Sequence, residues 1–407
     1  MEMQRLIQIR KEKGKEIAKT GKVKLVGNKW IVPSQSSNKY YSVTLGMDKS
    51  ACDCPDFVER EMKCKHIYSV EITITRQVAF DGSVTETKRI TYSQNWNAYD
   101  KGQTQQKELF MKFLHDLCLS IPEDQNPRGK GRPKLPIRDM VFASGLKVFT
   151  TFSLRRFMSD INTAKQLGYI ERTPHFSMVS SYLKKEELTP ILNELITLSA
   201  MPLKSVETKF AIDSTGLRTT KFTEYANIRY KLEKHHQWIK LHICCGVKTN
   251  IITAVEVSLD GKETSSDSPQ FIPLTKQTYE KGFEIQEMTA DKAYSSKDNL
   301  AYVKEVGGVA YIPFRSNATA ASAHSTYLWR NTYNYFTYRR EEFMEHYHLR
   351  SNVESTFNMI KSKFSDLVRS KNVTAQRNEV LLKILCHNIS VLIQEMFELG
   401  IKPNFVG

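Results

Sequence analysis

The sequence lacks any long hydrophobic run. No stretch comes near the roughly 18 consecutive apolar residues that a membrane-spanning helix needs. The N-terminal segment "MEMQRLIQIRKEKGKEIAKTGKVK" is too highly charged for a secretory signal peptide. Internal repeats and low-complexity tracts are also missing. We therefore expect an intracellular protein with no membrane partner.

Acidic residues are outnumbered in this chain, with 44 Asp and Glu against 59 Lys and Arg and a net charge of +15. Because phosphate neutralisation drives association with nucleic acids, a polyanion is the expected partner. Charge alone does not separate DNA from RNA or from an anionic membrane. The 407 residues, 40% of them hydrophobic and 25% charged, are ordinary for a globular protein of more than one domain.

Cysteines are few, odd in number at seven, and clustered. Cys52, Cys54, Cys64 and His66 form a C-x-C pair and a C-x-H pair separated by nine residues. Two close pairs of such ligands are what a closed tetrahedral zinc site requires, and they suit a reduced compartment better than a disulfide framework does. We predict one structural Zn²⁺ here, the alternative being incidental buried cysteines beside a chance histidine.

The same segment, "CDCPDFVEREMKCKH" with its "PDF" and "CKH", resembles the SWIM zinc finger, a module associated with DNA or protein binding. Alternating residues upstream, in "KWIVPSQSSNKYYSVTL", predict a small β-rich knuckle followed by a helix. We place the SWIM-like finger at about 28–75, within an N-terminal region of 1–120.

A basic Pro/Gly linker is expected at 121–136, since it contains almost nothing to bury. Four of its side chains resemble an AT-hook minor-groove contact, although a solvated hinge explains them equally well. These residues are Arg128, Lys130, Arg132 and Lys134. Residues 137–204 follow with helical periodicity, which fits either a DNA-binding helix-turn-helix or an all-helical packing domain.

Two aspartates stand where apolar runs turn polar. "ETKFAIDSTGLR" predicts Asp213 at or near the end of a buried strand, and "WIKLHICCGV" and "IITAVEVSL" predict two further strands of a meander. Next come a short strand ending near Asp291, a helix, and another strand at 309–313. Taken singly, each aspartate is better explained as a turn former or helix cap.

A glutamate stands among basic and aromatic residues in "YHLRSNVESTFNMIK". On one helix, Tyr347, Arg350, Glu354 and Lys361 would share a polar stripe, because their steps are three, four and seven. A neighbouring apolar stripe is expected to pack on a core. Its members are Leu349, Val353, Phe357, Ile360 and Phe364. Taken alone, Arg350 and Glu354 are best explained as an exposed ion pair.

The combination resembles the DDE transposases of bacterial insertion sequences. The blocks "AIDSTGL", "KLHI", "TADKAY" and "IPFRSNA" carry this resemblance, together with a match to the YREK signature by Tyr347, Arg350, Glu354 and Lys361. It covers roughly residues 130 to 395. It implies an α/β fold with a ribonuclease-H-like mixed sheet and flanking helices, which we place at 205–398.

The resemblance also implies a site and a reaction. Asp213, Asp291 and Glu354 would converge as catalytic carboxylates holding two Mg²⁺ or Mn²⁺ ions, for which hard oxygen ligands are suited. The reaction would be cleavage of double-stranded DNA at the element's ends and transfer to target DNA, by a dimer when synapsed, in the bacterial cytoplasm or nucleoid. The side chains that would contact DNA are Tyr347, Arg350 and Lys361.

Other interpretations stay open. A metal-dependent DNA nuclease without strand transfer, or a non-catalytic zinc-finger protein derived from a transposase, would share these features. Trp329 would stack on a displaced base or pack against the late helix. Lys240 and His242 would serve strand packing or DNA backbone contact, and the amphipathic segment 375–399 would cover the sheet or join a subunit interface.

Overall fold

The computed structural model describes most of the chain and divides it into two units, 1–96 and 97–407. The described residues are 2–19, 23–26, 29–35, 37, 39–45, 50–60, 62–78, 84–88, 95–122, 135–219, 238–259, 267–320 and 326–405. The four basic side chains expected to contact DNA from the linker lie outside these ranges. Those residues are Arg128, Lys130, Arg132 and Lys134.

Unit 1–96 is built on a small antiparallel sheet with the strand order β1-β2-β3-β4. The strands are β1 (Lys24–Val26), β2 (Lys29–Pro33), β3 (Tyr40–Thr44) and β4 (Ala51–Cys52). Helix α3 packs against α1 and against this sheet. The remaining elements are α1 (Glu2–Lys19), α2 (Pro55–Arg60), α3 (Lys65–Thr73) and the hairpin of β5 (Ile74–Val78) and β6 (Val84–Lys88). The strand pair and following helix expected around the cysteines are therefore present.

Unit 97–407 contains a five-stranded mixed sheet with the order β11-β10-β7-β8-β9. Strands β7, β8 and β9 form the expected antiparallel meander, while β10 runs parallel to both β7 and β11. The bounds are β7 (Lys209–Arg218), β8 (Trp238–Gly246), β9 (Ile252–Leu259), β10 (Glu287–Ala290) and β11 (Val309–Tyr311). This topology confirms the mixed α/β class and the ribonuclease-H-like strand order expected from the sequence.

Helices cover both faces of this sheet, as its alternating side chains require. On one face, Thr356 of α15 contacts Cys245, and Asn388 of α16 bonds the backbone of Ile252. On the other face, Thr278 of α11 bonds Thr253. The helices concerned are α11 (Ser268–Glu280), α12 (Lys297–Glu305), α15 (Ser351–Phe364) and α16 (Val373–Glu398). The sheet is therefore the middle layer of three.

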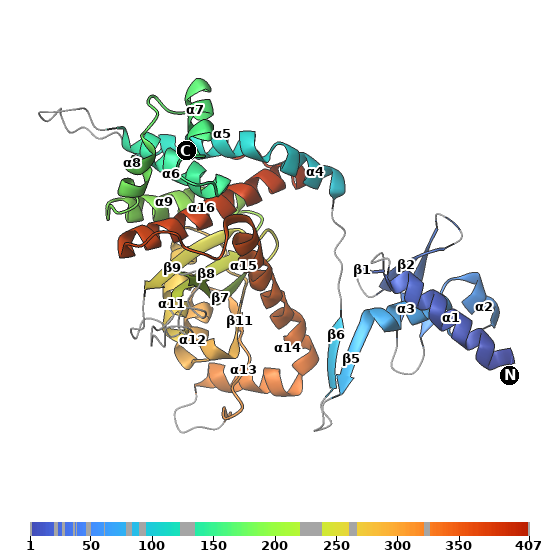
Figure 1. The fold of residues 1–407 in the computed structure, drawn as a ribbon. Helices are drawn as coiled ribbons and strands as arrows, with labels where there is room; N and C mark the ends of the chain where they lie inside the picture. The colour runs from blue at the N-terminus through green and yellow to red at the C-terminus, as the bar shows by residue number, and fades with distance from the viewer. Residues whose placement is uncertain are drawn as a thin grey trace, which may run out of the picture. The chain divides into compact units, whose positions relative to one another are not determined.

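A helical layer packs against α16 and, through one of its helices, directly against strand β9 (Figure 1). Its members are α4 (Trp96–Thr104), α5 (Gln106–Leu119), α6 (Ile137–Thr150), α7 (Met158–Gln166), α8 (Phe176–Tyr182), α9 (Leu188–Ala200) and η1 (Met201–Leu203). We expected the N-terminal region to extend to residue 120, but the division falls at 96/97. The reason is that α5 buries its apolar side chains in the core of the second unit.

Helix α16 forms the centre of that core. Of the described helices, it is the one long and apolar enough to cross a membrane, but 83% of its apolar window is buried inside the protein. The amide of Asn388 links three elements, because it bonds Ile252 on β9, Ser199 on α9 and the carbonyl of Ile196. Fully burying each Leu or Ile of such a helix contributes about 1.5 to 3 kcal/mol, so α16 is a main source of the unit's stability.

Candidate active site and candidate zinc site

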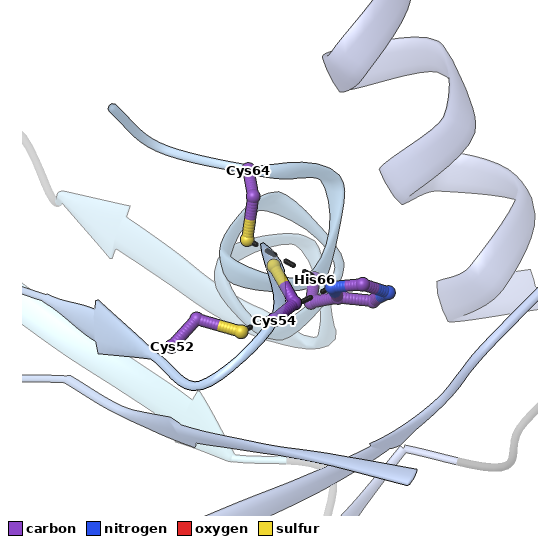
Figure 2. A group of neighbouring side chains, drawn as sticks. All are labelled: Cys52, Cys54, Cys64 and His66. Carbon is purple, nitrogen blue, oxygen red and sulfur yellow. Dashed lines mark hydrogen bonds between the residues drawn. The ribbon is translucent and has the colours of Figure 1, made fainter. Parts of the chain in front are cut away.

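The cysteines and histidine predicted to bind zinc lie together in unit 1–96. Their four ligand atoms are all within 4.8 Å of one another, and all four residues are buried. Figure 2 shows the sulfur atoms of Cys52, Cys54 and Cys64 gathered together, with dashed lines that join His66 to Cys52 and Cys64. Cys52 ends strand β4 and His66 lies in the first turn of α3, so short loops bring the two pairs together.

The pKa values of the cysteines indicate why this group would bind a cation. Cys52 shares a hydrogen bond with Cys64, and this bond lowers the pKa of Cys64 to about 4 while the pKa of Cys52 is raised. Three thiolates cannot share so small a buried volume without a positive charge among them. Nδ1 of His66 lies 3.9 Å from the sulfurs of Cys52 and Cys64, so this nitrogen is the one that would complete a Cys₃His zinc site.

Asp213 and Asp291 lie at the point where β10 ends. The last paired residue of β10, Ala290, stands opposite Ile212 of the parallel strand β7, so the next residues along the two strands are Asp291 and Asp213. Asp213 was expected at or near its strand's end, but β7 continues to Arg218 because Ser, Thr and Gly stay paired with β8. The strand that ends beside Asp213 is the neighbouring strand β10.

The four residues Tyr347, Arg350, Glu354 and Lys361 were expected on one continuous α-helix. The segment is helical, but it is divided into three parts. Tyr347 ends α14 (Arg340–Tyr347), Arg350 ends the 3-10 turn η4 (His348–Arg350), and Glu354 and Lys361 belong to α15. The predicted apolar stripe does pack on the core, with Leu349 half-buried and the rest buried. The polar stripe consequently faces strand β7, where Nζ of Lys361 donates to Oγ1 of Thr215 over 2.7 Å.

Arg350 joins two of the three carboxylates. Its guanidinium donates from Nη2 to Oδ2 of Asp213 over 2.7 Å and from Nη1 to Oε1 of Glu354 over 2.8 Å. The local pair with Glu354 was the simple alternative for this segment, whereas the bond to Asp213 crosses 137 residues of sequence. Among the described residues, the donor atoms of the zinc group are gathered within ligand distance of one another, whereas Asp213, Asp291 and Glu354 do not form such a group.

The charge balance at Asp213 bears on whether a metal ion fits. Burial raises the pKa of Asp213, and Asp291 raises it further, whereas Arg350 and the N–H of Ser214 lower it, with a net raised pKa. Arg350 thus compensates only part of the cost of ionising this carboxyl. Additional positive charge would be stabilising here, and carboxylate oxygens are the donors that Mg²⁺ and Mn²⁺ prefer.

Comparison with protein families decides the identity of both regions. Residues 204–389 match the family described as Transposase DDE domain, and residues 41–74 match the SWIM zinc finger. This chain carries a transposase DDE domain behind a SWIM zinc finger. A similar solved structure is the cryo-EM structure of a piggyBac transposase synaptic complex with hairpin DNA, at 11% identity and a TM-score of 0.37, covering 76% of each chain. The two family matches confirm the resemblance seen in the sequence for residues 41–74 and 204–389.

The opposite face of β7 in the DDE domain carries a polar group that the sequence did not reveal. Oγ of Ser214 donates to Asp267 over 2.7 Å, and Nζ of Lys240 lies 2.8 Å from the same carboxylate oxygen. His242, completely buried, lies 3.7 Å from that oxygen, too far for a hydrogen bond. Lys240 and His242, both on strand β8, therefore lie on the face of the sheet opposite to Asp213. The signal that could have found Asp267 is its place before Ser-Pro at a helix start.

Trp329 belongs to α13 (Tyr327–Tyr338) and packs rather than standing free. Its Nε1 donates to the carbonyl of Thr319 over 3.0 Å, and its ring meets Phe314 edge to face at 4.7 Å. Packing against the late helix was one of its two expected roles, but the partner found is Phe314, which follows strand β11. The aromatic residues of α13 gather around Phe314, which explains their density between the second aspartate and the glutamate.

A second missed pair anchors helix α14 to the sheet. Nδ1 of His346 lies 2.9 Å from Oε2 of Glu287, the first residue of β10, and Lys209 of β7 pairs with the other oxygen. The His346 ring stacks on Tyr311 with 4.3 Å between centroids. Because His346 directly precedes Tyr347, this anchor fixes the segment that presents Arg350 to Asp213. Its partners lie on three separate elements, so no local pattern predicts it.

Proposed function

We propose that this chain is a DNA transposase that binds its element's ends, cuts the phosphodiester backbone and joins the resulting 3'-hydroxyl to target DNA. The single observation that carries the proposal is the meeting of Asp213 and Asp291 at the end of β10, with Arg350 tying Asp213 to Glu354. The match of residues 204–389 to the transposase DDE domain supports the same reaction class.

In this proposal Asp213, Asp291 and Glu354 are the catalytic carboxylates. Two Mg²⁺ or Mn²⁺ ions, when bound, would activate the attacking oxygen and stabilise the leaving oxygen. Asp213, Asp291 and Glu354 would together hold these ions through their carboxylate oxygens. In both aspartates Oδ1 accepts the next backbone N–H, at 2.8 Å in Asp213 and 2.6 Å in Asp291. These bonds fix the orientation of the carboxylates and leave Oδ2 as the oxygen that would bind an ion.

The DNA-contacting side chains are Arg350, Lys361 and Tyr347. Lys361 reaches Thr215, two residues along β7 from Asp213 and therefore on the same face of the strand. Two cations along one strand face suit two phosphates of a backbone, with Arg350 offering a bidentate grip and Lys361 a point charge. Tyr347, half-buried beside them, adds a hydrogen bond or a stacking contact.

The remaining modules serve binding. The SWIM finger holds one structural Zn²⁺, and it shares recognition of DNA with the basic linker 121–136 and the helical segment 137–204. Two copies assemble when two element ends are synapsed. The working location is the cytoplasm, at the nucleoid of a bacterium.

The test compares the wild-type protein with Glu354→Gln, each incubated with Mg²⁺ and a plasmid carrying the DNA that flanks this gene. Cleavage at defined sequences by the wild type and not by the variant supports the proposal. The matched control is Glu341→Gln, an exposed position on α14, which should cleave as the wild type does. Equal cleavage by Glu354→Gln would remove Glu354 from the chemistry, and tight binding without cleavage would favour a non-catalytic DNA-binding protein.

The reaction products distinguish a transposase from a nuclease that lacks strand transfer. In the same reaction, joined molecules in which an end is linked to new target sequence are expected of a transposase. Linear cleavage products alone, with the 3'-hydroxyl left free, would select the nuclease.

A further inference from the structure

Arg350 occupies the carboxylates that a divalent cation would need. Oδ2 of Asp213 and Oε1 of Glu354 each accept a guanidinium N–H, at 2.7 and 2.8 Å. The other oxygen of Asp213 is already bonded to the backbone N–H of Ser214. The outward oxygen of Asp213 is thus the one that Arg350 holds.

The ion pair of Arg350 and Asp213 is partly buried, so its electrostatic interaction is strong enough to affect binding of a cation. The side chains of Arg350 and Asp213 are 20% and 16% exposed, so their charges are only partly screened by water. A divalent cation bound to Asp213 and Glu354 with Arg350 in place would face the guanidinium across the same two carboxylates. Mutual repulsion would weaken such binding, so Arg350 and the cation compete for these oxygens.

Arg350 has the capacity to bind elsewhere. Its Nε is buried and, among the described residues, has no hydrogen-bond partner, so the side chain is not fully satisfied where it lies. A phosphodiester group accepts the planar guanidinium with two parallel hydrogen bonds. If the guanidinium moves to a phosphate, Asp213 and Glu354 lose their shared counter-ion, and leaving them unpaired is costly.

We propose that Arg350 is a positioning residue that couples DNA binding to metal binding at this site, a step that rests on the proposed function. In the free protein Arg350 offsets part of the negative charge of Asp213 and Glu354 and so weakens their affinity for the cation. When DNA is bound, Arg350 contacts a phosphate and the freed carboxylates take the metal. Because binding linkage is reciprocal, the metal tightens DNA binding by the same factor.

The test measures Mn²⁺ binding rather than activity. Free Mn²⁺ is titrated by electron paramagnetic resonance into the full-length, zinc-loaded protein, with and without a duplex copied from the DNA flanking this gene, after subtraction of Mn²⁺ bound by duplex alone. The wild type should bind Mn²⁺ at least about fivefold more tightly with the duplex. Arg350→Gln should bind Mn²⁺ more tightly than wild type without DNA and gain less from the duplex.

Two controls assign the result. Arg340→Gln removes a positive charge from α14, where the guanidinium lies over the Phe336 ring, and should behave as wild type. Asp213→Asn should lose the Mn²⁺ site under both conditions. If Arg350→Gln does not fold, the comparison of wild type with and without duplex still decides the coupling.

The failures are distinguishable. Mn²⁺ binding that is unchanged in Asp213→Asn would overturn the site and, with it, the proposed function. Binding that is lost in Asp213→Asn but strengthened neither by the duplex nor by Arg350→Gln would overturn the coupling alone.

Discussion

The two candidate metal sites of this chain are built in opposite ways. In the SWIM finger all four donor atoms lie within 4.8 Å of one another and all four residues are buried. In the DDE domain the guanidinium of Arg350 is bonded to both Asp213 and Glu354, and the side chain of Glu354 is 60% exposed. A structural zinc site has its ligands preassembled because folding depends on the ion, whereas a catalytic site must admit and release its ions.

The strongest way to break this comparison is to remove a zinc ligand. Cys64→Ser should abolish zinc binding and unfold unit 1–96, because structural zinc contributes on the order of 10 kcal/mol to folding, while unit 97–407 stays folded. Zinc content by mass spectrometry and mapping of proteolytic cuts on the full chain check this. Cys118→Ala, a buried cysteine outside the finger, should retain one zinc ion per chain. Unchanged zinc content in Cys64→Ser would contradict the assignment.

The corresponding change in the DDE domain should leave the fold intact but remove the chemistry. Asp213→Asn is expected to lower the cleavage rate by at least about a thousandfold, equivalent to roughly 4 kcal/mol of activation free energy, with the melting of unit 97–407 little changed. Single-turnover cleavage and calorimetry measure the two effects. Asp298→Asn, an exposed aspartate on α12, is the matched control. A rate within tenfold of the wild type would exclude Asp213 as a metal ligand.

A smaller effect should come from the anchor of α14. Burial alone would raise the pKa of Glu287, but hydrogen bonds from Lys209 and His346 bring it below the ordinary value of 4.5. A lowered pKa in the folded state stabilises the fold above pH 4.5, and this contribution is lost as pH falls through the folded-state pKa.

Glu287→Gln should therefore cost about 1 to 3 kcal/mol at neutral pH and flatten the acid limb of the stability curve of unit 97–407. Urea unfolding of the variant and wild type between pH 3 and pH 7 (roughly the span of this titration) checks it. Parallel curves with the same acid limb would show that the contact with His346 and Lys209 does not stabilise the fold.

The smallest expected effect concerns Lys361. Lys361→Gln should weaken DNA binding a few-fold and lower the dependence of log affinity on log salt by about one, because one phosphate contact is lost. Filter binding at several salt concentrations measures this, with Lys304→Gln on α12 as control. A slope that does not change would remove Lys361 from the DNA contacts.

The difference between the two sites also decides how far the sequence could predict them. The zinc ligands stand in two short local pairs, so spacing alone identified Cys52, Cys54, Cys64 and His66. The class of sheet followed from the order of apolar runs together with the family resemblance. The neighbouring positions of Asp213 and Asp291 depend on the register between β7 and β10, which no local pattern sets.

The helix bearing Glu354 shows the same limit. The helical periodicity of the sequence correctly predicted the buried apolar stripe and the local bond between Arg350 and Glu354. It gave neither the 3-10 turn at His348–Arg350 nor the second bond of Arg350 to Asp213, because both depend on where α14 is anchored by His346. Long-range pairs of this kind follow from packing and are visible only once the sheet is assembled.

The position of α16 in the chain has a consequence for synthesis. The ribosome delivers this helix after every strand of the sheet and after all three carboxylates, yet it supplies the centre of the core and the Asn388 amide that joins β9 to α9. Unit 97–407 cannot complete its core until Glu398 has been translated, whereas unit 1–96 can fold long before. A nascent chain therefore folds its zinc finger first, and its DDE domain only once α16 has left the exit tunnel.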